Sequence, residues 1–153
     1  MMKPIRFLSV LMIVLVLCCG CQRTVNPEQK GNITLYQMAD DGSKLQSSEY
    51  EIQADQEDNV AVIQELLDCF KKCVAIDNFQ LKEKQLTITF LSSYYNQDKI
   101  DEVLNRAAIV KTLCQLSSVE YVEFYVGDNP LVIDGETVGI MSKLSFLDSV
   151  EIG

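Results

Sequence analysis

Residues 98–126 read DKIDEVLNRAAIVKTLCQLSSVEYVEFYV, a helix pattern followed directly by a strand pattern. The first part predicts a helix from Asp98 to about Leu116, with Asp98 as N-cap and Asp101 three residues later, as in a capping box. The end of the segment alternates apolar and polar side chains over residues 122–126, which predicts a half-buried strand. The segment therefore indicates a domain that mixes helices and strands.

The residues before this segment predict four strands and one further helix. Strand patterns lie at residues 32–38, 45–52, 79–81 and 86–90, and a short turn joins the two members of each pair. Between the pairs, apolar side chains recur at helical spacing from residue 59 to residue 73. Asp58 is the expected N-cap of this helix.

The residues after the segment predict a last strand, residues 131–133, beyond a turn at residues 127–130. The order of elements is then β-β-α-β-β-α-β-β. Strands joined by short turns must be antiparallel. We therefore predict a single α+β domain over residues 32–153, with a mixed, mostly antiparallel sheet and two helices on one face of it.

The charge of the chain excludes some classes of partner. The 153 residues carry 13 Lys and Arg against 22 Asp and Glu, a formal net charge of −9. An acidic chain repels the phosphate backbone, so we expect no nucleic acid as partner. The sequence contains no His, the usual general base and metal ligand, and we expect neither an enzyme nor a cofactor.

The N-terminus has the pattern of an export signal. An uncharged run over residues 7–19 follows two basic side chains. Its length is typical of the apolar core of a signal peptide and is short for a membrane span, which needs about 20 residues. An uncleaved, slightly short transmembrane anchor is the alternative. Both interpretations place the domain outside the cytoplasm.

The end of this run resembles the bacterial lipobox, in which a Cys follows a small residue. Gly20 and Cys21 match its last two positions, whereas Cys18 stands where the motif has Leu. We predict a signal peptide over residues 1–20, a lipid anchor on Cys21, and a flexible tether that ends at residue 31. Cys18 and Cys19 are the competing acceptors of the lipid, but the residues before them fit the motif poorly. The predicted location is the outer face of the cell membrane.

The segment from Arg106 to Leu131 resembles the GerMN domain of sporulation and spore-germination lipoproteins. The shared features are a helix that ends in Thr112-Leu113 and a polar residue, a Val-rich strand, and a turn at residues 127–130. The opening strand, Ile33 to Tyr36, is also similar. The resemblance implies a protein-binding α/β module without known chemistry, and partners among envelope or sporulation proteins. Many family members carry two tandem copies, whereas this sequence stops near residues 146–148, where a second copy would begin. We expect either a one-copy member or a truncated reading of a longer protein.

Three cysteines of the predicted domain allow more than one interpretation. Cys69 and Cys73 lie four residues apart on the first predicted helix, a spacing too wide for a disulfide between them. Cys73 and Cys114 are expected as small core residues, and a bridge from Cys114 to Cys69 or Cys73 is the alternative. With no His and fewer than four suitable ligands, we expect no metal site.

Two candidate binding surfaces follow from the apolar pattern. The expected core stripe of the second predicted helix is Ile100, Val103, Leu104, Ala107, Val110 and Cys114. Ile109, Leu113 and Leu116 lie roughly opposite this stripe and could contact a partner or a second copy of the chain. The alternative is that this helix is covered on both sides, which would bury both stripes. Tyr94 and Tyr95 in the loop before it could instead stack on a sugar ring.

Taken together, the sequence predicts a membrane-anchored lipoprotein outside the cytoplasm. Its domain is expected to act as a non-catalytic protein-interaction module in sporulation or spore germination. A lipoprotein that binds a small ligand or a cell-wall fragment is the alternative, and it depends on the two tyrosines.

Overall fold

The computed structural model describes residues 31–146, and the predicted signal peptide, Cys21 and most of the tether lie outside this range. Two α-helices and eight strands follow one another, with short 3₁₀ turns after β4 and at the end. The bounds are β1 (Asn32–Met38), β2 (Leu45–Glu51), α2 (Asn59–Asp68), β3 (Ile76–Lys82), β4 (Gln85–Phe90), η1 (Ser92–Asn96), α3 (Lys99–Leu113), β5 (Tyr121–Val126), β6 (Asn129–Pro130), β7 (Val132–Ile133), β8 (Glu136–Thr137) and η2 (Lys143–Phe146).

The largest sheet has the strand order β3-β4-β5-β6. β3 and β4 form an antiparallel hairpin, β4 and β5 are parallel, and β5 and β6 are antiparallel. The chain crosses between the two parallel strands through α3, as a parallel pair requires. Leu86, Ile88 and Phe90 of β4 are buried on one face, together with Val122 and Phe124 of β5.

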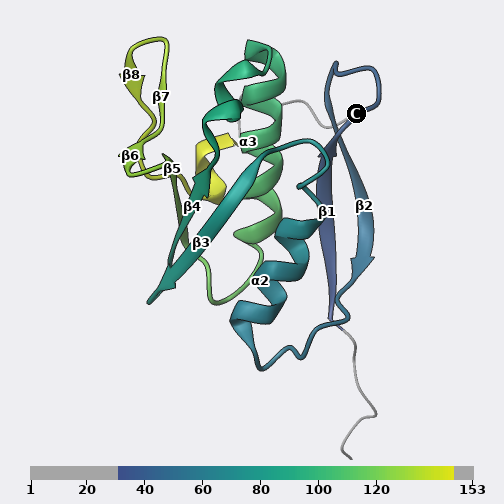
Figure 1. Ribbon diagram of the computed structural model, residues 1–153. Helices are drawn as coiled ribbons and strands as arrows, with labels where there is room; N and C mark the ends of the chain where they lie inside the picture. Colours follow the sequence, from purple (N-terminus) through teal and green to yellow (C-terminus); the bar gives the residue numbers. More distant parts are fainter. Residues whose placement is uncertain (1–30, 147–153) are drawn as a thin grey trace, which may run out of the picture.

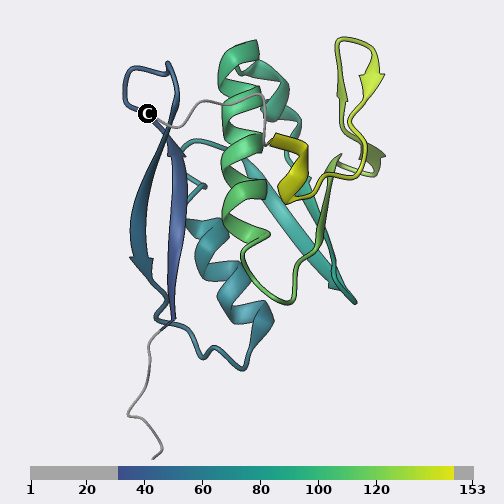
Figure 2. The same cartoon turned by 180° about the vertical axis from the view of Figure 1, so that it is seen from behind.

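The first two strands form a separate antiparallel pair, the N-terminal hairpin (β1 and β2). Figures 1 and 2 show α3 between this hairpin and the four-stranded sheet, with α2 beside it. The predicted α+β class and the order of the main elements are confirmed. The strands, however, divide into three sheets rather than one, because the helices separate the N-terminal hairpin from the rest.

The helix ends differ in part from the predicted ones. Asp58 is confirmed as the cap of α2, since its carboxylate accepts hydrogen bonds from the N–H groups of Val60 and Ala61. The helix ends at Asp68, not at Cys73, because tighter turns follow that place Phe70 and Val74 in the core. These turns leave Cys73 exposed, so its expected place in the core was wrong.

The helix α3 begins after Asp98 as predicted but ends at Leu113. The Asp98 side chain makes no capping hydrogen bond, so the predicted capping box does not form. Neither helix within residues 31–146 is long and apolar enough to cross a membrane.

Candidate functional site

The predicted partner-binding stripe on α3 lies in the core. Ile109 and Leu113 have no exposed surface, and Leu116, beyond the helix end, is half-buried. The reason is that α3 is covered by the four-stranded sheet, by the N-terminal hairpin and by η2, so Ile109 and Leu113 are buried on one side of it and Ala107 and Val110 on the other. Ile100 and Val103, expected in the core stripe, are 66% and 41% exposed instead.

Tyr94 is also a core residue, which removes the predicted pair of stacking tyrosines. Its ring stacks on Phe90 at 4.0 Å between centroids, and its hydroxyl donates to Glu102 at 2.9 Å. Burial, together with the nearby charge of Glu102, raises the pKa of Tyr94 far above its ordinary value. Only Tyr95, at 50% exposure, is available to a ligand.

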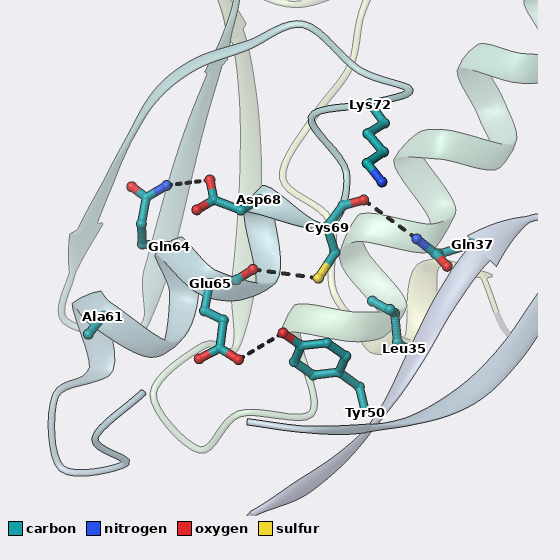
Figure 3. A pocket seen from close by; sticks show the side chains of 9 residues that line it. All are labelled: Leu35, Gln37, Tyr50, Ala61, Gln64, Glu65, Asp68, Cys69 and Lys72. Carbon is teal, nitrogen blue, oxygen red and sulfur yellow. Dashed lines mark hydrogen bonds between the residues drawn. The ribbon is translucent and has the colours of Figure 1, made fainter. Parts of the chain in front are cut away.

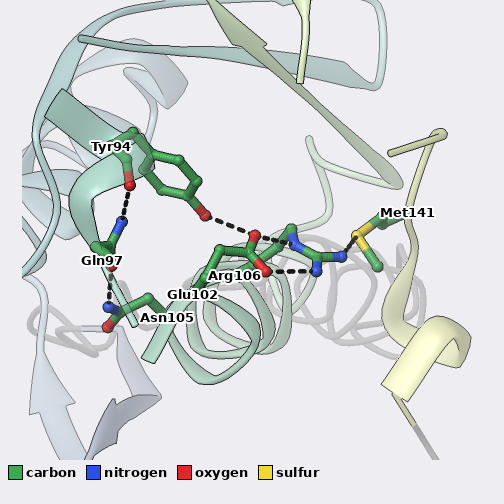
Figure 4. A network of polar contacts seen from close by, with 6 residues as sticks. All are labelled: Tyr94, Gln97, Glu102, Asn105, Arg106 and Met141. Carbon is green, nitrogen blue, oxygen red and sulfur yellow. Dashed lines mark hydrogen bonds and ion pairs between the residues drawn. The ribbon is translucent and has the colours of Figure 1, made fainter. Parts of the chain in front are cut away.

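Glu102 is the centre of a buried polar network that fixes α3 against its surroundings. Arg106 donates to both of its carboxylate oxygens, at 2.7 and 2.9 Å, and reaches the Met141 sulfur at 3.5 Å (Figure 4). The side chain of Arg106 is 12% exposed and that of Glu102 is 6% exposed. No buried side-chain N or O atom within residues 31–146 lacks a hydrogen-bond partner. The network is structural, since every member is already occupied.

One edge of the N-terminal hairpin is closed by two polar side chains of the α3 region. The Gln115 amide accepts from the Thr34 N–H at 3.1 Å and donates to the Thr34 carbonyl at 2.7 Å. The Thr112 hydroxyl accepts from the Tyr36 N–H at 3.0 Å. These side chains take the place of a neighbouring strand along the outer edge of β1.

The other edge of the hairpin is open. In an antiparallel pair, the backbone N–H and C=O groups of two directly opposed residues either point toward each other or both point away. Those of Thr34 and Tyr36 point away from β2, so those of the two residues opposite them must point away from β1. These two residues are Glu49 and Ser47 of β2. Within residues 31–146, no strand pairs with this side of β2. The N–H and C=O groups of Ser47 and Glu49 therefore point away from β1 and have no strand partner in the described part of the chain.

A groove lies beside β2, between the N-terminal hairpin and α2, and is here called the α2 groove. Its volume is about 660 Å³. Figure 3 shows hairpin side chains facing helix side chains across it. The residues that line it are Leu35, Gln37, Tyr50, Ala61, Gln64, Glu65, Asp68, Cys69 and Lys72.

Glu65 holds the two walls of the α2 groove together. Its carboxylate accepts from the Tyr50 hydroxyl at 2.8 Å and from the N–H groups of Gln53 and Ala54 at 2.9 and 2.6 Å. Burial opposes ionisation, but these hydrogen bonds outweigh it and hold the pKa of Glu65 below its ordinary value. The hydrogen bond to Glu65 in turn raises the pKa of Tyr50 well above its ordinary value.

The described cysteines are unpaired thiols. Cys69 lies in the α2 groove and donates to the Glu65 carbonyl at 3.6 Å, while burial raises the pKa of its thiol. Burial also raises the pKa of Cys114, which is half-buried as expected for a small core residue. The structure does not form the alternative bridge from Cys114 to Cys69 or Cys73. Because nucleophilic attack requires the thiolate, the raised pKa makes both thiols poor nucleophiles.

Within residues 31–146, no three Cys, Asp or Glu side chains gather closely enough to hold a metal ion. The titratable groups of the α2 groove are Tyr50, Glu65, Asp68, Cys69 and Lys72. Glu65 and Tyr50 are already bonded to each other, and Asp68 is paired with Lys71 at 2.7 Å. Tyr50, Glu65 and Asp68 are therefore engaged with partners inside the domain.

The sequence of the described domain matches a known protein family. A model described as "Germane: Sporulation and spore germination" matches residues 34–132, most of the described domain. This chain belongs to the Germane family. The expected resemblance to GerMN domains is confirmed. No curated protein matches the sequence of this chain.

Two solved structures share the Germane fold of this chain. The first GerMN domain of the sporulation protein GerM from Bacillus subtilis has a TM-score of 0.55 at 14% identity, over 71% of this chain and 94% of that one. The tandem GerMN domains of the same protein give a TM-score of 0.54 at 12% identity, over 75% of this chain and 48% of theirs. This chain thus spans about half of the tandem protein. At these identities the likeness shows the fold.

The α2 groove and the open edge of β2 were not predicted from the sequence. β2 was expected, but its residues Gln46 to Glu49 are all exposed and give no periodic signal. The nearest signal was the family pattern of a helix that ends in Thr-Leu and a polar residue. In this Germane domain, Thr112 and Gln115 at that position close the opposite edge.

Proposed function

We propose that this chain is an extracytoplasmic lipoprotein, anchored through Cys21, whose Germane domain acts as a non-catalytic protein-interaction module in sporulation or spore germination. The observation that carries the proposal is the family match over residues 34–132, because the description of that family names a developmental process and no reaction. The domain expected over residues 32–153 would then be the part that contacts envelope proteins.

The N-terminal pattern supports the anchor. An uncharged run, a Gly-Cys pair and a polar stretch precede β1 directly in the sequence. β1 starts at the lower end of the molecule in Figure 1, and the β7–β8 hairpin and the first turn of α3 lie at the upper end. A tether that leaves from the lower end would keep both the upper end and the β2 edge accessible to partners.

The state of the groups in the α2 groove supports a non-catalytic role. Glu65 is held ionised by three donors and Tyr50 is held protonated by Glu65, so neither is free to exchange a proton with a substrate. The net charge of −9 supports a protein partner over a nucleic acid.

The test is the position of an outward-facing fluorescent fusion through a sporulation time course. We expect enrichment at the engulfing septum that is lost in Cys21→Ala and kept in the matched control Cys19→Ala. A uniform peripheral signal in vegetative cells, unchanged during sporulation, would contradict the sporulation role. A signal that is unaffected by Cys21→Ala would contradict the lipid anchor.

A further inference from the structure

We infer that the open edge of β2 and the adjacent α2 groove bind an extended, basic segment of a partner protein by strand addition. The inference rests on the proposed role as an interaction module and names the surface and the chemistry of the partner. In this binding mode, backbone hydrogen bonds to an edge strand hold the segment, and alternate side chains enter a neighbouring groove.

The backbone of β2 supplies the first requirement. Ser47 and Glu49 each present an outward N–H and C=O, which is the repeat that an added strand needs. The pairing of β1 with β2 is regular over seven residue pairs, so the edge contains no bulge that would block a neighbour. Gln46, Ser47, Ser48 and Glu49 are all exposed.

The other long strand with an open edge is less suited to accept a segment. β3 lies at the end of the four-stranded sheet, and its register shifts between Ile76 and Asn78. Bulges of this kind twist an edge away and protect it from pairing. Of these two edges, only that of β2 combines a regular pairing with a groove beside it.

The α2 groove supplies the second requirement. Side chains of an added strand alternate between its two faces, so every second one would point toward α2. Leu35, Tyr50 and Cys69 give the groove an apolar floor, and Gln64 and Asp68 line its helix side (Figure 3). A volume of about 660 Å³ accommodates one or two apolar side chains of the segment.

The negative charge near the β2 edge favours a basic partner segment over a second copy of the chain. Glu49 projects from the middle of the exposed edge strand. In the groove, Asp68 is already paired with Lys71 and Lys72 is a second cation, so the charge that bears on an added strand is that of Glu49. A second copy of the chain would bring its own Glu49 close to this one and add a net charge of −9. A basic segment is attracted by Glu49 and by the net negative charge of the chain, so the partner is a segment in which Lys or Arg alternate with apolar residues.

The test uses the full chain in non-ionic detergent and a fluorescein-labelled heptapeptide with Lys at alternate positions and Val or Leu between them. The matched peptide carries Glu in place of Lys. We expect the basic peptide to bind, measured by fluorescence anisotropy, and the acidic peptide not to bind. Ser47→Pro removes one outward N–H at a position where an edge strand tolerates Pro. It is expected to weaken binding about tenfold, whereas Ser47→Thr keeps the N–H and the affinity.

Amide hydrogen exchange of the unaltered chain gives a readout that does not depend on the folding of a variant. Bound basic peptide is expected to slow exchange at Ser47 and Glu49. The inference is overturned if neither peptide binds, if both bind alike, if Ser47→Pro binds as well as Ser47→Thr, or if the two amides are already protected without peptide because another part of the chain covers the edge. None of these outcomes bears on septal localisation, so a failure here leaves the proposed function standing.

Discussion

The two edges of the N-terminal hairpin differ in their hydrogen bonding. Along β1, the N–H groups of Thr34 and Tyr36 are bonded to Gln115 and Thr112. Along β2, the facing residues Glu49 and Ser47 have no strand partner within residues 31–146. Both edges belong to strands of the same length in one regular pair, so strand pattern alone does not explain the difference.

The difference comes from a contact that spans 81 residues, between Thr34 and Gln115. A carboxamide has one acceptor and one donor group, so a single Gln side chain can satisfy both backbone groups of a strand residue. The α3 side of the hairpin is therefore fixed by partners within the domain, and the β2 side remains available to another molecule.

The largest effect is expected where α3 is held by buried charge. Arg106→Leu leaves Glu102 buried without its cation and is expected to lower the free energy of unfolding by about 3–5 kcal/mol. Urea denaturation measures the change. The control is Lys99→Leu, which breaks the exposed pair with Asp134 and should cost at most about 1 kcal/mol. Equal losses in the two variants would show that burial does not set the strength of these pairs.

Removing the closing side chain of the β1 edge should have a moderate effect. Gln115→Leu leaves both backbone groups of Thr34 without their partner and is expected to cost about 1–2 kcal/mol. Gln64→Leu is the matched control, because among the described residues its amide bonds only the exposed Asp68. If both variants unfold at the same urea concentration, Gln115 does not close the edge.

A smaller effect is expected when one residue pair of the hairpin is used to compare its two edges. Thr34 and Glu49 face each other, and each is replaced by Pro in turn. Thr34→Pro removes an N–H that is bonded, whereas Glu49→Pro removes one that has no strand partner in the described part of the chain. We expect Thr34→Pro to be the less stable variant by about 1 kcal/mol in thermal unfolding. The reverse order would break the assignment of the edges.

The smallest effect is a pH dependence at the α2 groove. The folded-state pKa of Glu65 lies below its ordinary value of 4.5, so its contribution to stability is present above that value and is lost as pH falls toward the folded pKa. The stability gap between the unaltered chain and Glu65→Gln should therefore shrink from pH 7 to pH 4. Glu136→Gln, at an exposed position in β8, is the control. A gap that grows on acidification would reverse the predicted sign.

The sequence predicted the elements whose cause is local. The alternation of Ile33 and Leu35 marks β1 with its observed bounds, and Asp58 marks the start of α2. The predicted end of α2, at Cys73, was wrong, because the end at Asp68 depends on the burial of Phe70 and Val74 rather than on a local stop signal.

The exposure of the candidate binding residues depends on how the elements pack in three dimensions, and most of these predictions were wrong for that reason. Ile109 and Ile100 are apolar residues of the same helix, but Ile109 is fully buried whereas Ile100 is 66% exposed. Adjacent Tyr94 and Tyr95 differ in the same way, since only Tyr94 stacks on Phe90. The open edge could not be predicted either, because it depends on which strand Gln115 reaches.

The measurement that tests the contrast most directly is the exchange rate of four amides in the chain without any ligand. Our account predicts that Thr34 and Tyr36 exchange at least about a hundredfold more slowly than Ser47 and Glu49, which should exchange close to the rate of an unstructured peptide. Equal protection at all four amides would mean that the β2 edge is covered, and the distinction between a closed and an open edge would be wrong.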